Sequence, residues 1–540
     1  MRLHYTLIAD WPPLAWLARW HPRDDVLEVR HGRRVETHPD WFGEVVWAGA
    51  YTAGDFDRTD LVFGSGARVR DGLVTFVSAG STVDRLLSLE QPDLNRVSNS
   101  LPCLLADAGG SVDPADPDYF SAFRSISLGL DRYQKCLPTG AGPVRLTYFY
   151  NLIWTGLGLV EADKRFVRRK LPTFELYRDF LRASLGRLAE NMACTARRHR
   201  YQLLGTVSSG FDSAAVTALG RVCGLRQVIT FDRSSDGYPD TGEAIGRILG
   251  VDVAVISRDA WRRRGGVEVP FIAADAKGED VPLAGAEAFL FGRVLLTGYH
   301  GDRMWAMHNR ALSPDIVRSD QSGLSLAEFR LRAGFIHCPV PFFAVRQIAD
   351  VHAISHSPAM RRWDVSGRYN RPIARRIVEE AGVPRGEFAL RKQAVSVLFF
   401  LEKRGLSEPA RAEYAAWIEA RAAAWRTRGR RPPRLGVSSV NLLKAVFRGV
   451  ARGLRIIAQL APRQLGILQE LGDRIADAGW RQAPFRYAFP WALERMIESY
   501  LTPALRVHSQ VAPQPNIPGR TADQDAKRPG LDDPAPLAVQ

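Results

Sequence analysis

A short Ser/Gly turn between an apolar strand and an apolar helix constrains this chain more than any other stretch. The residues from Ser208 to Ser213 read Ser-Ser-Gly-Phe-Asp-Ser. The apolar run that ends at Val207 predicts a buried strand, and the run that begins at Ala214 predicts a helix. Such a turn directs backbone N–H groups and the positive end of a helix at one point, which favours a phosphate chain. We therefore expect a phosphate site on an α/β fold.

The acidic residue of this turn has a role in the same prediction. Asp212 stands where the turn enters the helix, so its carboxylate can hold a Mg²⁺ ion that bridges phosphates. The turn is not a Walker loop, because no Gly-Lys-Ser/Thr follows it. The alternative interpretation is an ordinary strand–turn–helix connection with a serine cap.

The six residues resemble the pyrophosphatase-type loop, Ser-Gly-Gly-x-Asp-Ser, of enzymes that split ATP into AMP and pyrophosphate. Resemblance to the asparagine-synthetase superfamily extends from about Tyr177 to about Val397. Ser209 stands where that family usually has glycine, and it would be strained if the position needed a positive φ. The resemblance implies that ATP is bound by Val207, Ser208, Ser209, Gly210, Phe211, Asp212, Ser213, Phe231, Gly298 and Lys392.

A second acidic loop follows a later apolar strand. The run from Val294 to Thr297 continues as Gly-Tyr-His-Gly and ends at Asp302. Ligands of open α/β sheets bind beyond the carboxyl ends of the strands, where both acidic loops are expected. This loop is similar to the Thr-Gly-Tyr-Gly-x-Asp loop of β-lactam synthetases, which implies that Asp302 shares Mg²⁺ and pyrophosphate with Asp212. The alternative for Asp302 is a solvated turn residue.

The same resemblance implies three catalytic residues. Tyr299 matches a tyrosine that, with a downstream glutamate, deprotonates the attacking amine; a phenol is too weak a base at pH 7 unless a neighbour takes its proton. Glu328, on an expected helix, is the candidate for that glutamate. Lys392 matches a lysine that contacts the adenylate and the developing oxyanion. The alternatives are a pocket-lining aromatic for Tyr299 and a solvated basic face for Lys392.

The N-terminal sequence lacks the nucleophile of a glutaminase. Asparagine synthetases begin with a glutaminase domain that has an N-terminal cysteine, whereas here Arg2 follows the first residue and the first cysteine is Cys103. Short strands are expected within 45–51, 60–63 and 72–78. Their placement resembles a degenerate glutaminase-like domain, and an unrelated α+β domain is the alternative.

The length of 540 residues suggests two to four domains. We expect a degenerate glutaminase-like domain over 1–165 and an asparagine-synthetase-like ATP-binding domain over 173–425. A charged run that ends at Pro172 separates the two. A helical region over 435–508 and a disordered tail over 509–540 complete the prediction.

Composition limits compartment and partners. Five scattered cysteines without a Cys-x-x-Cys pair favour a reducing compartment, no run of 18 apolar residues is present, and no secretory signal is evident, so we expect a cytoplasmic protein. The net charge is +15, but no recognised nucleic-acid motif accompanies it, and no nucleic-acid partner is expected. The stretch 441–460 predicts a basic amphipathic helix that packs on its own domain or contacts a membrane surface or a protein.

These expectations combine into one hypothesis. The fold is α/β, with a parallel-sheet ATP-pyrophosphatase-type synthetase domain preceded by a degenerate glutaminase-like α+β domain. The resemblance implies an ATP-dependent, Mg²⁺-dependent ligase that adenylates a small-molecule or peptide carboxylate, releases pyrophosphate and transfers the acyl group to an amine, without glutamine. The alternative is an inactive homologue that binds a nucleotide or a partner, which Ser209 and Arg303 (a glutamate in asparagine synthetases) favour. Fold analogy does not identify the substrates.

Overall fold

The fold is described from a computed structural model of the chain. The described residues all belong to one compact unit that spans residues 1–505. Three expectations lie outside the described residues: the role of Lys392, the tail over 509–540, and the helix over 441–460 apart from residues 449, 450, 453 and 454. The structure describes residues 1–113, 119–166, 168–309, 312–365, 367, 369–391, 393–397, 399, 405–427, 449–450, 453–454, 471 and 484–501.

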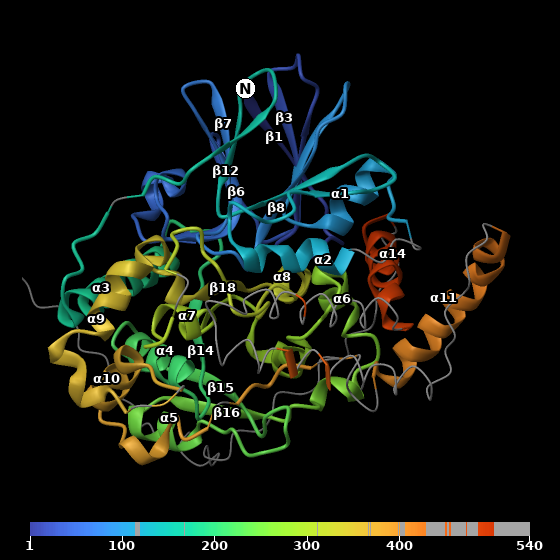
Figure 1. Cartoon of the computed structure of the whole chain (residues 1–540). Helices are drawn as coiled ribbons and strands as arrows, with labels where there is room; N and C mark the ends of the chain where they lie inside the picture. Colours follow the sequence, from blue (N-terminus) through green and yellow to red (C-terminus); the bar gives the residue numbers. More distant parts are fainter. Residues whose placement is uncertain are drawn as a thin grey trace, which may run out of the picture. The chain divides into compact units, whose positions relative to one another are not determined.

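Two sheets built almost wholly from antiparallel pairs form the N-terminal part (Figure 1). The first has the order β1-β3-β2-β9-β8-β11-β10, in which only β1 and β3 are parallel. Its strands are β1 (Arg2–Leu7), β2 (Trp16–Trp20), β3 (Val26–His31), β8 (Arg85–Leu89), β9 (Asn95–Ser98), β10 (Cys136–Leu137) and β11 (Val144–Tyr148).

The second sheet has the order β13-β12-β7-β6-β5-β4. Its strands are β4 (Glu36–Thr37), β5 (Trp41–Trp47), β6 (Val62–Arg70), β7 (Leu73–Val77), β12 (Asn151–Trp154) and β13 (Leu159–Ala162). Apolar side chains of both sheets share one buried cluster, in which Trp16 of β2 contacts Phe42 of β5. The two sheets pack face to face. The strands expected within 45–51, 60–63 and 72–78 overlap β5, β6 and β7, although β5 ends at Trp47 and β6 begins only at Val62.

A five-stranded parallel sheet follows in the sequence. Its order is β16-β15-β14-β17-β18, and all neighbouring strands are parallel. The prediction of a mixed α/β fold with a parallel sheet is confirmed. Because β15 and β17 flank β14 on opposite sides, the chain reverses its direction of travel across the sheet at β14, where such sheets bind ligands. The strands are β14 (Gln202–Thr206), β15 (Gln227–Phe231), β16 (Asp252–Ile256), β17 (Arg293–Thr297) and β18 (Ile336–Pro339).

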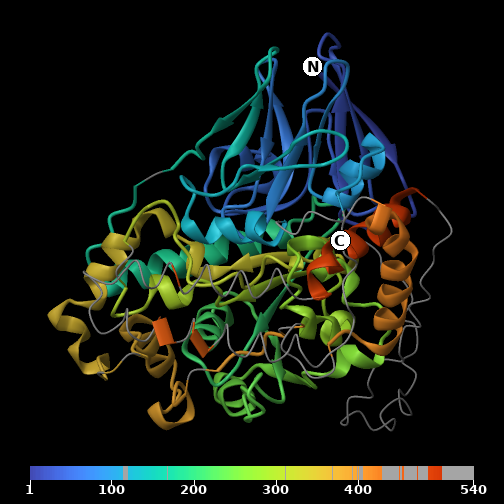
Figure 2. The ribbon, with the colours of Figure 1, turned by 45° about the vertical axis from the view of Figure 1, so that its right-hand side comes forward.

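Most helices lie around the parallel sheet (Figures 1 and 2). The expected helix after the serine turn is α4, the helix after β15 is α5, and the helix expected to carry Glu328 is α8. Among the described residues, no helix has both the length and the apolar character that crossing a membrane requires. The helices are α1 (Leu101–Ala108), α2 (Tyr119–Arg124), α3 (Phe174–Ala193), α4 (Phe211–Arg221), α5 (Glu243–Leu249), α6 (Val269–Asp275), α7 (Gly301–Met304), α8 (Leu326–Ala333), α9 (Ile348–Ser355), α10 (Pro372–Glu380), α11 (Glu408–Thr427) and α14 (Ala488–Leu501).

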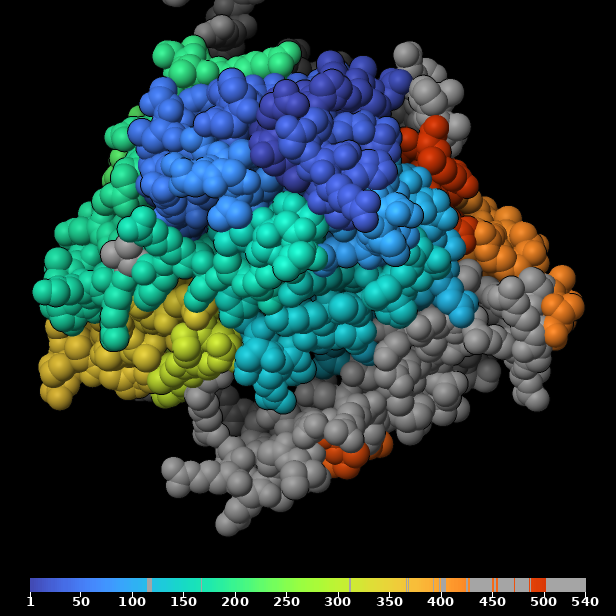
Figure 3. Space-filling view, turned by 90° about the horizontal axis from the view of Figure 1, so that it is seen from above, coloured from blue at the N-terminus to red at the C-terminus, as the bar shows by residue number. Residues whose placement is uncertain are grey.

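The N-terminal residues, in blue, form much of the face seen in Figure 3. A buried ionic cluster joins the N-terminal sheets to the parallel-sheet part. Arg330 of α8 donates from Nη1 to Glu44 Oε2 and from Nε to Asp84 Oδ1, each over 2.8 Å. All three side chains are almost fully buried. Each charge therefore depends on its partners, since removal of one leaves the others buried and unpaired.

Candidate functional site

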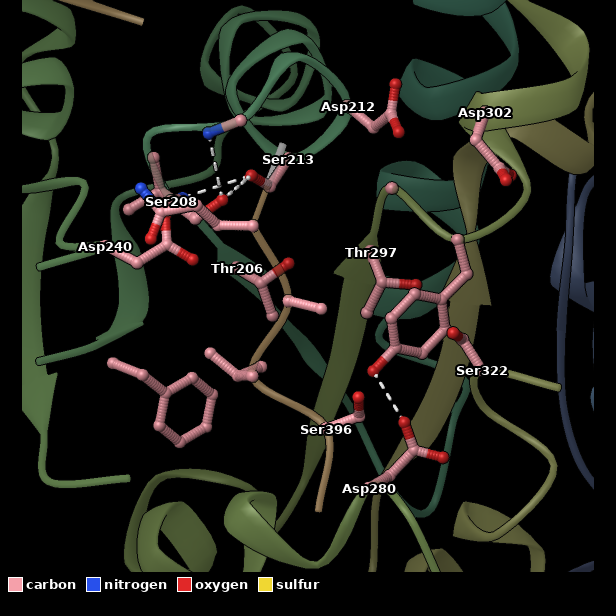
Figure 4. A pocket seen from close by; sticks show the side chains of 18 of the residues that line it. Thr206, Ser208, Asp212, Ser213, Asp240, Asp280, Thr297, Asp302, Ser322 and Ser396 are labelled. Carbon is pink, nitrogen blue, oxygen red and sulfur yellow. Dashed lines mark hydrogen bonds between the residues drawn. The ribbon is translucent and has the colours of Figure 1, made fainter. Parts of the chain in front are cut away.

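The pocket lies at the carboxyl ends of β14, β15 and β17 (Figure 4). Its cavity measures about 260 Å³. Six carboxylates line it, from Asp212, Asp240, Glu279, Asp280, Asp302 and Asp320. Ser208, Ser213, Asp212 and Asp302 lie at one end, and Asp280 and Ser396 at the other (Figure 4). Most of the carboxylates thus meet from loops far apart in the sequence because parallel strands end at the same edge of a sheet.

The serine turn connects β14 to α4 and is held by its own side chains. Ser208 N donates to Ser213 Oγ over 3.0 Å, and Gly210 N donates to Ser208 Oγ over 3.2 Å. Ser209 donates from both N and Oγ to Asp240 Oδ1, over 3.3 and 2.7 Å. Ser209 is not among the described residues with a positive φ, so serine is unstrained where the resembled family has glycine.

Asp212 lies against the loop that follows β17. A Cβ added to Gly298 would lie 2.6 Å from Asp212 Cβ, and one added to Gly301 would lie 2.5 Å from Asp212 Cγ. Both positions therefore require glycine if the aspartate is to keep its place. The two glycines explain how carboxylates from two strand ends come to share one end of the pocket.

The carboxylate of Asp212 is only half satisfied. Arg371, at the start of α10, donates from Nη1 to Oδ2, whereas Oδ1 is buried and has no hydrogen-bond partner within the described part of the chain. Burial lowers the pKa of Arg371 to about 10, so the guanidinium is still charged at neutral pH. A buried carboxylate oxygen without a partner fits a cation that arrives with a ligand.

Asp302 lies in the first turn of α7, and Ser319 Oγ donates to its Oδ2. Asp212 and Asp302 thus line the same end of the pocket, as the proposed sharing of Mg²⁺ requires. No group of three or more His, Cys, Asp or Glu side chains that could hold a metal occurs within the described residues. The two carboxylates suit Mg²⁺, which commonly takes one or two of them together with phosphate oxygens and water.

Tyr299 pairs with an aspartate that precedes it in the sequence. Its hydroxyl donates to Asp280 Oδ1 over 3.0 Å, while Asp280 Oδ2 accepts from Gly323 N over 2.9 Å and from Ser325 Oγ over 2.7 Å. Burial, followed by the charge of Glu279, raises the pKa of Asp280 to about 7. Burial also raises the pKa of the Tyr299 phenol well above its ordinary value. The pair therefore places a carboxyl group whose pKa is near neutral beside a phenol.

The expected pairing of Tyr299 with Glu328 is wrong in this structure. Glu328 lies in the first turn of α8, and Ser100 Oγ and Leu101 N donate to its two oxygens over 2.8 and 3.0 Å. Glu328 thus accepts hydrogen bonds from the residues at the N-terminal end of α1, in the N-terminal part of the chain. Periodicity placed it correctly on a helix, but the face of α8 that carries it is turned toward α1 and not toward the pocket.

A pH titration distinguishes this structural role. Burial raises the pKa of Glu328 from 4.5 to about 7, so the native state keeps a proton that the unfolded state loses from about pH 4.5 upward. The free energy of unfolding is expected to fall between those pH values by about 3 kcal/mol. Glu328→Gln should remove that decrease in the free energy of unfolding, as measured by urea unfolding at pH 4 and pH 8. The same substitution should leave nucleotide binding unchanged. Glu387→Gln, at an exposed position, is the control; an identical pH dependence in the Glu328 variant would contradict this role.

Most of the predicted site residues line the pocket. Ser209 does not line it directly but holds Asp240, which does. Those that line it are Val207, Ser208, Gly210, Phe211, Asp212, Ser213, Phe231, Gly298, Tyr299 and Asp302.

The predicted site residues did not include five charged lining residues: Asp240, Glu279, Asp280, Asp320 and Arg371. A signal existed for two of them, since the stretch Lys277-Gly-Glu-Asp280 is an acidic turn before a proline. No local signal links that turn to Tyr299, because the link is a tertiary contact.

No family model matches the chain, and no curated protein matches it either. The fold and the pocket together define the class of protein: an α/β protein with a carboxylate-rich pocket at the switch point of a parallel sheet.

Proposed function

We propose that the protein is an ATP-dependent ligase of the asparagine-synthetase type, which adenylates a carboxylate, releases pyrophosphate and transfers the acyl group to an amine. The parallel sheet is then of the ATP-pyrophosphatase type, and the N-terminal part is a glutaminase-like domain without its nucleophile. The five cysteines are all free thiols, which favours a reducing, cytoplasmic setting.

One observation carries the proposal. Asp212, at the entry of α4, lies against two glycines of the β17 loop, and one of its oxygens is buried without a hydrogen-bond partner among the described residues. A strand–serine turn–helix unit that faces a second acidic loop suits a magnesium-bound polyphosphate. Mg²⁺ bound to these carboxylates would neutralise the charge of the phosphates and stabilise pyrophosphate as the leaving group.

Residues at the two ends of the pocket have different proposed roles. Arg371 is a fixed cation beside the phosphate end, positioned to stabilise charge that develops when the bond to pyrophosphate breaks. The pair of Tyr299 and Asp280 is the proposed base, in place of a pair with Glu328. As the amine nitrogen bonds to the acyl carbon, its proton passes to Tyr299 and on to Asp280, and AMP leaves with the electron pair of the broken C–O bond.

Calorimetry with a non-hydrolysable Mg·ATP analogue tests the proposal without knowledge of the other substrates. The wild-type protein is expected to bind the analogue, and to bind it much more weakly without Mg²⁺. Gly298→Ala should reduce Mg²⁺-dependent binding by at least about 10-fold, because the new methyl would displace Asp212.

Gly186→Ala is the matched control, since a Cβ at this position of α3 meets nothing within 4 Å. It should bind the analogue as the wild type does. If the folded wild type binds no analogue, the ligase proposal is contradicted and the non-catalytic, partner-binding alternative is favoured.

A further inference from the structure

The end of the pocket that contains Asp280 is acidic. Glu279 and Asp320 also line the pocket, and their charges, with that of Asp280, act on Tyr299 at this end. The only cationic side chain among the described lining residues is Arg371, which contacts Asp212 at the opposite end. Any ligand group that reaches the Asp280 end therefore meets carboxylates and no lining cation.

Glu279 carries a buried carboxylate oxygen that is not hydrogen-bonded within the described part of the chain. The residue is 4% exposed, Lys277 pairs with its Oε2, and its Oε1 is buried without a hydrogen-bond partner among the described residues. Its backbone is fixed, because Val397 N donates to the Glu279 carbonyl over 2.8 Å. A buried carboxylate oxygen without a donor is costly, and a donor carried by a ligand would relieve that cost.

The charges that line this end are all negative. Glu279, Asp280 and Asp320 line the pocket, whereas the nearest cations lie outside its lining: Lys277 pairs with Glu279, and an Arg318 nitrogen lies 3.9 Å from an Asp320 oxygen. A ligand group that reaches the lining carboxylates is therefore better matched as a cation than as a second carboxylate.

We propose that Glu279 Oε1 binds a protonated primary amine, so that the acyl acceptor enters the pocket as an alkylammonium ion. This inference rests on the proposed ligase function. Glu279 acts as a binding residue and directly precedes Asp280 of the Tyr299–Asp280 pair in the sequence. The bound ammonium releases one proton to water before it attacks, which frees the nitrogen lone pair, and the Tyr299–Asp280 pair takes the second proton as the C–N bond forms. The substrate class is then an alkylamine with a free ammonium group, in preference to ammonia or an amide nitrogen.

Butylammonium at pH 7 is the probe, titrated into the full-length protein by calorimetry, and 1-butanol is the uncharged probe of the same length. Butylammonium is expected to bind at least about 10-fold more tightly than butanol. Glu279→Gln should remove most of that preference, with about a 10-fold loss of butylammonium affinity. Glu190→Gln, at an exposed position of α3 outside the pocket, should leave it unchanged.

A second variant gives an effect of opposite sign. Lys277→Gln removes the cation that shares Glu279, so butylammonium should bind more tightly by about 5-fold. Partial misfolding would weaken binding and cannot produce this gain. Equal affinity of butylammonium for wild type and Glu279→Gln, or equal binding of butanol and butylammonium, would overturn the inference.

The same titrations separate this inference from the function on which it rests. Binding of the Mg·ATP analogue is measured on the same samples without amine. A protein that binds the analogue but shows no butylammonium preference keeps the ligase proposal and overturns the ammonium site. A protein that binds butylammonium through Glu279 but binds no analogue supports the site and contradicts the ligase proposal.

Discussion

Replacing Asp212 with asparagine is expected to lower the affinity for a Mg·ATP analogue by at least about 100-fold, since even indirect partners of a metal site contribute 10- to 100-fold. The amide keeps the size of the side chain but loses the charge that Mg²⁺ requires. It also leaves the buried guanidinium of Arg371 without its carboxylate partner. Both effects occur at the phosphate end, so substrate binding at the far end should change little.

The Mg²⁺ dependence of binding identifies the cause. In the wild type, removal of Mg²⁺ should weaken analogue binding strongly, whereas in Asp212→Asn it should make little further difference. Asp252→Asn, on the exposed start of β16, is the control and should behave as the wild type. Retained Mg²⁺ dependence in a folded Asp212 variant would refute the metal assignment.

Arg330→Ala is expected to destabilise the protein by about 3–5 kcal/mol, because it leaves buried charges without a partner. Glu44 and Asp84 would remain inside the protein beside the missing guanidinium. Desolvation already raises the pKa of Glu44 above its ordinary value even with Arg330 present. Urea unfolding at pH 7 measures the loss.

The neighbouring helix position provides the control for that measurement. Arg332 is exposed on the same helix α8, so Arg332→Ala should change the free energy of unfolding by no more than about 0.5 kcal/mol. Arg330→Met combined with Glu44→Gln and Asp84→Asn removes all three charges and should recover part of the stability. An Arg330→Ala variant as stable as Arg332→Ala would show that the cluster contributes little.

The local part of the site could be predicted from the sequence. The serine turn sits between β14 and α4 as its apolar flanks indicate, and the second acidic loop follows β17. Both predictions rest on residues adjacent in the chain, where hydrophobic periodicity is informative. That both loops line one pocket follows from a parallel sheet, whose strands end at one edge.

The contacts across the fold could not be predicted in the same way. Periodicity placed Glu328 on a helix but could not show that its carboxylate would meet Ser100 and Leu101 of the N-terminal part. No local pattern indicates the role of Asp280, because its contact with Tyr299 depends on how the segment before η5 (Val281–Phe289) packs against the loop after β17. The polar neighbours of a buried group belong to the tertiary arrangement and leave no pattern in the local sequence.

The position of α14 affects the order in which parts of the chain can fold during synthesis. Tyr500 of α14 donates to Ser100 Oγ at the N-terminal cap of α1 over 3.1 Å, and its ring packs against Trp11. A segment translated among the last described residues therefore completes the surroundings of one translated near the beginning. Domains start to fold during synthesis. If the N-terminal sheets fold in this way, the surface of α1 that α14 covers stays exposed to solvent until α14 has been translated and has left the ribosome. Ribosome-stalled chains that end before α14 should accordingly be more sensitive to proteases near α1 than released full-length chains.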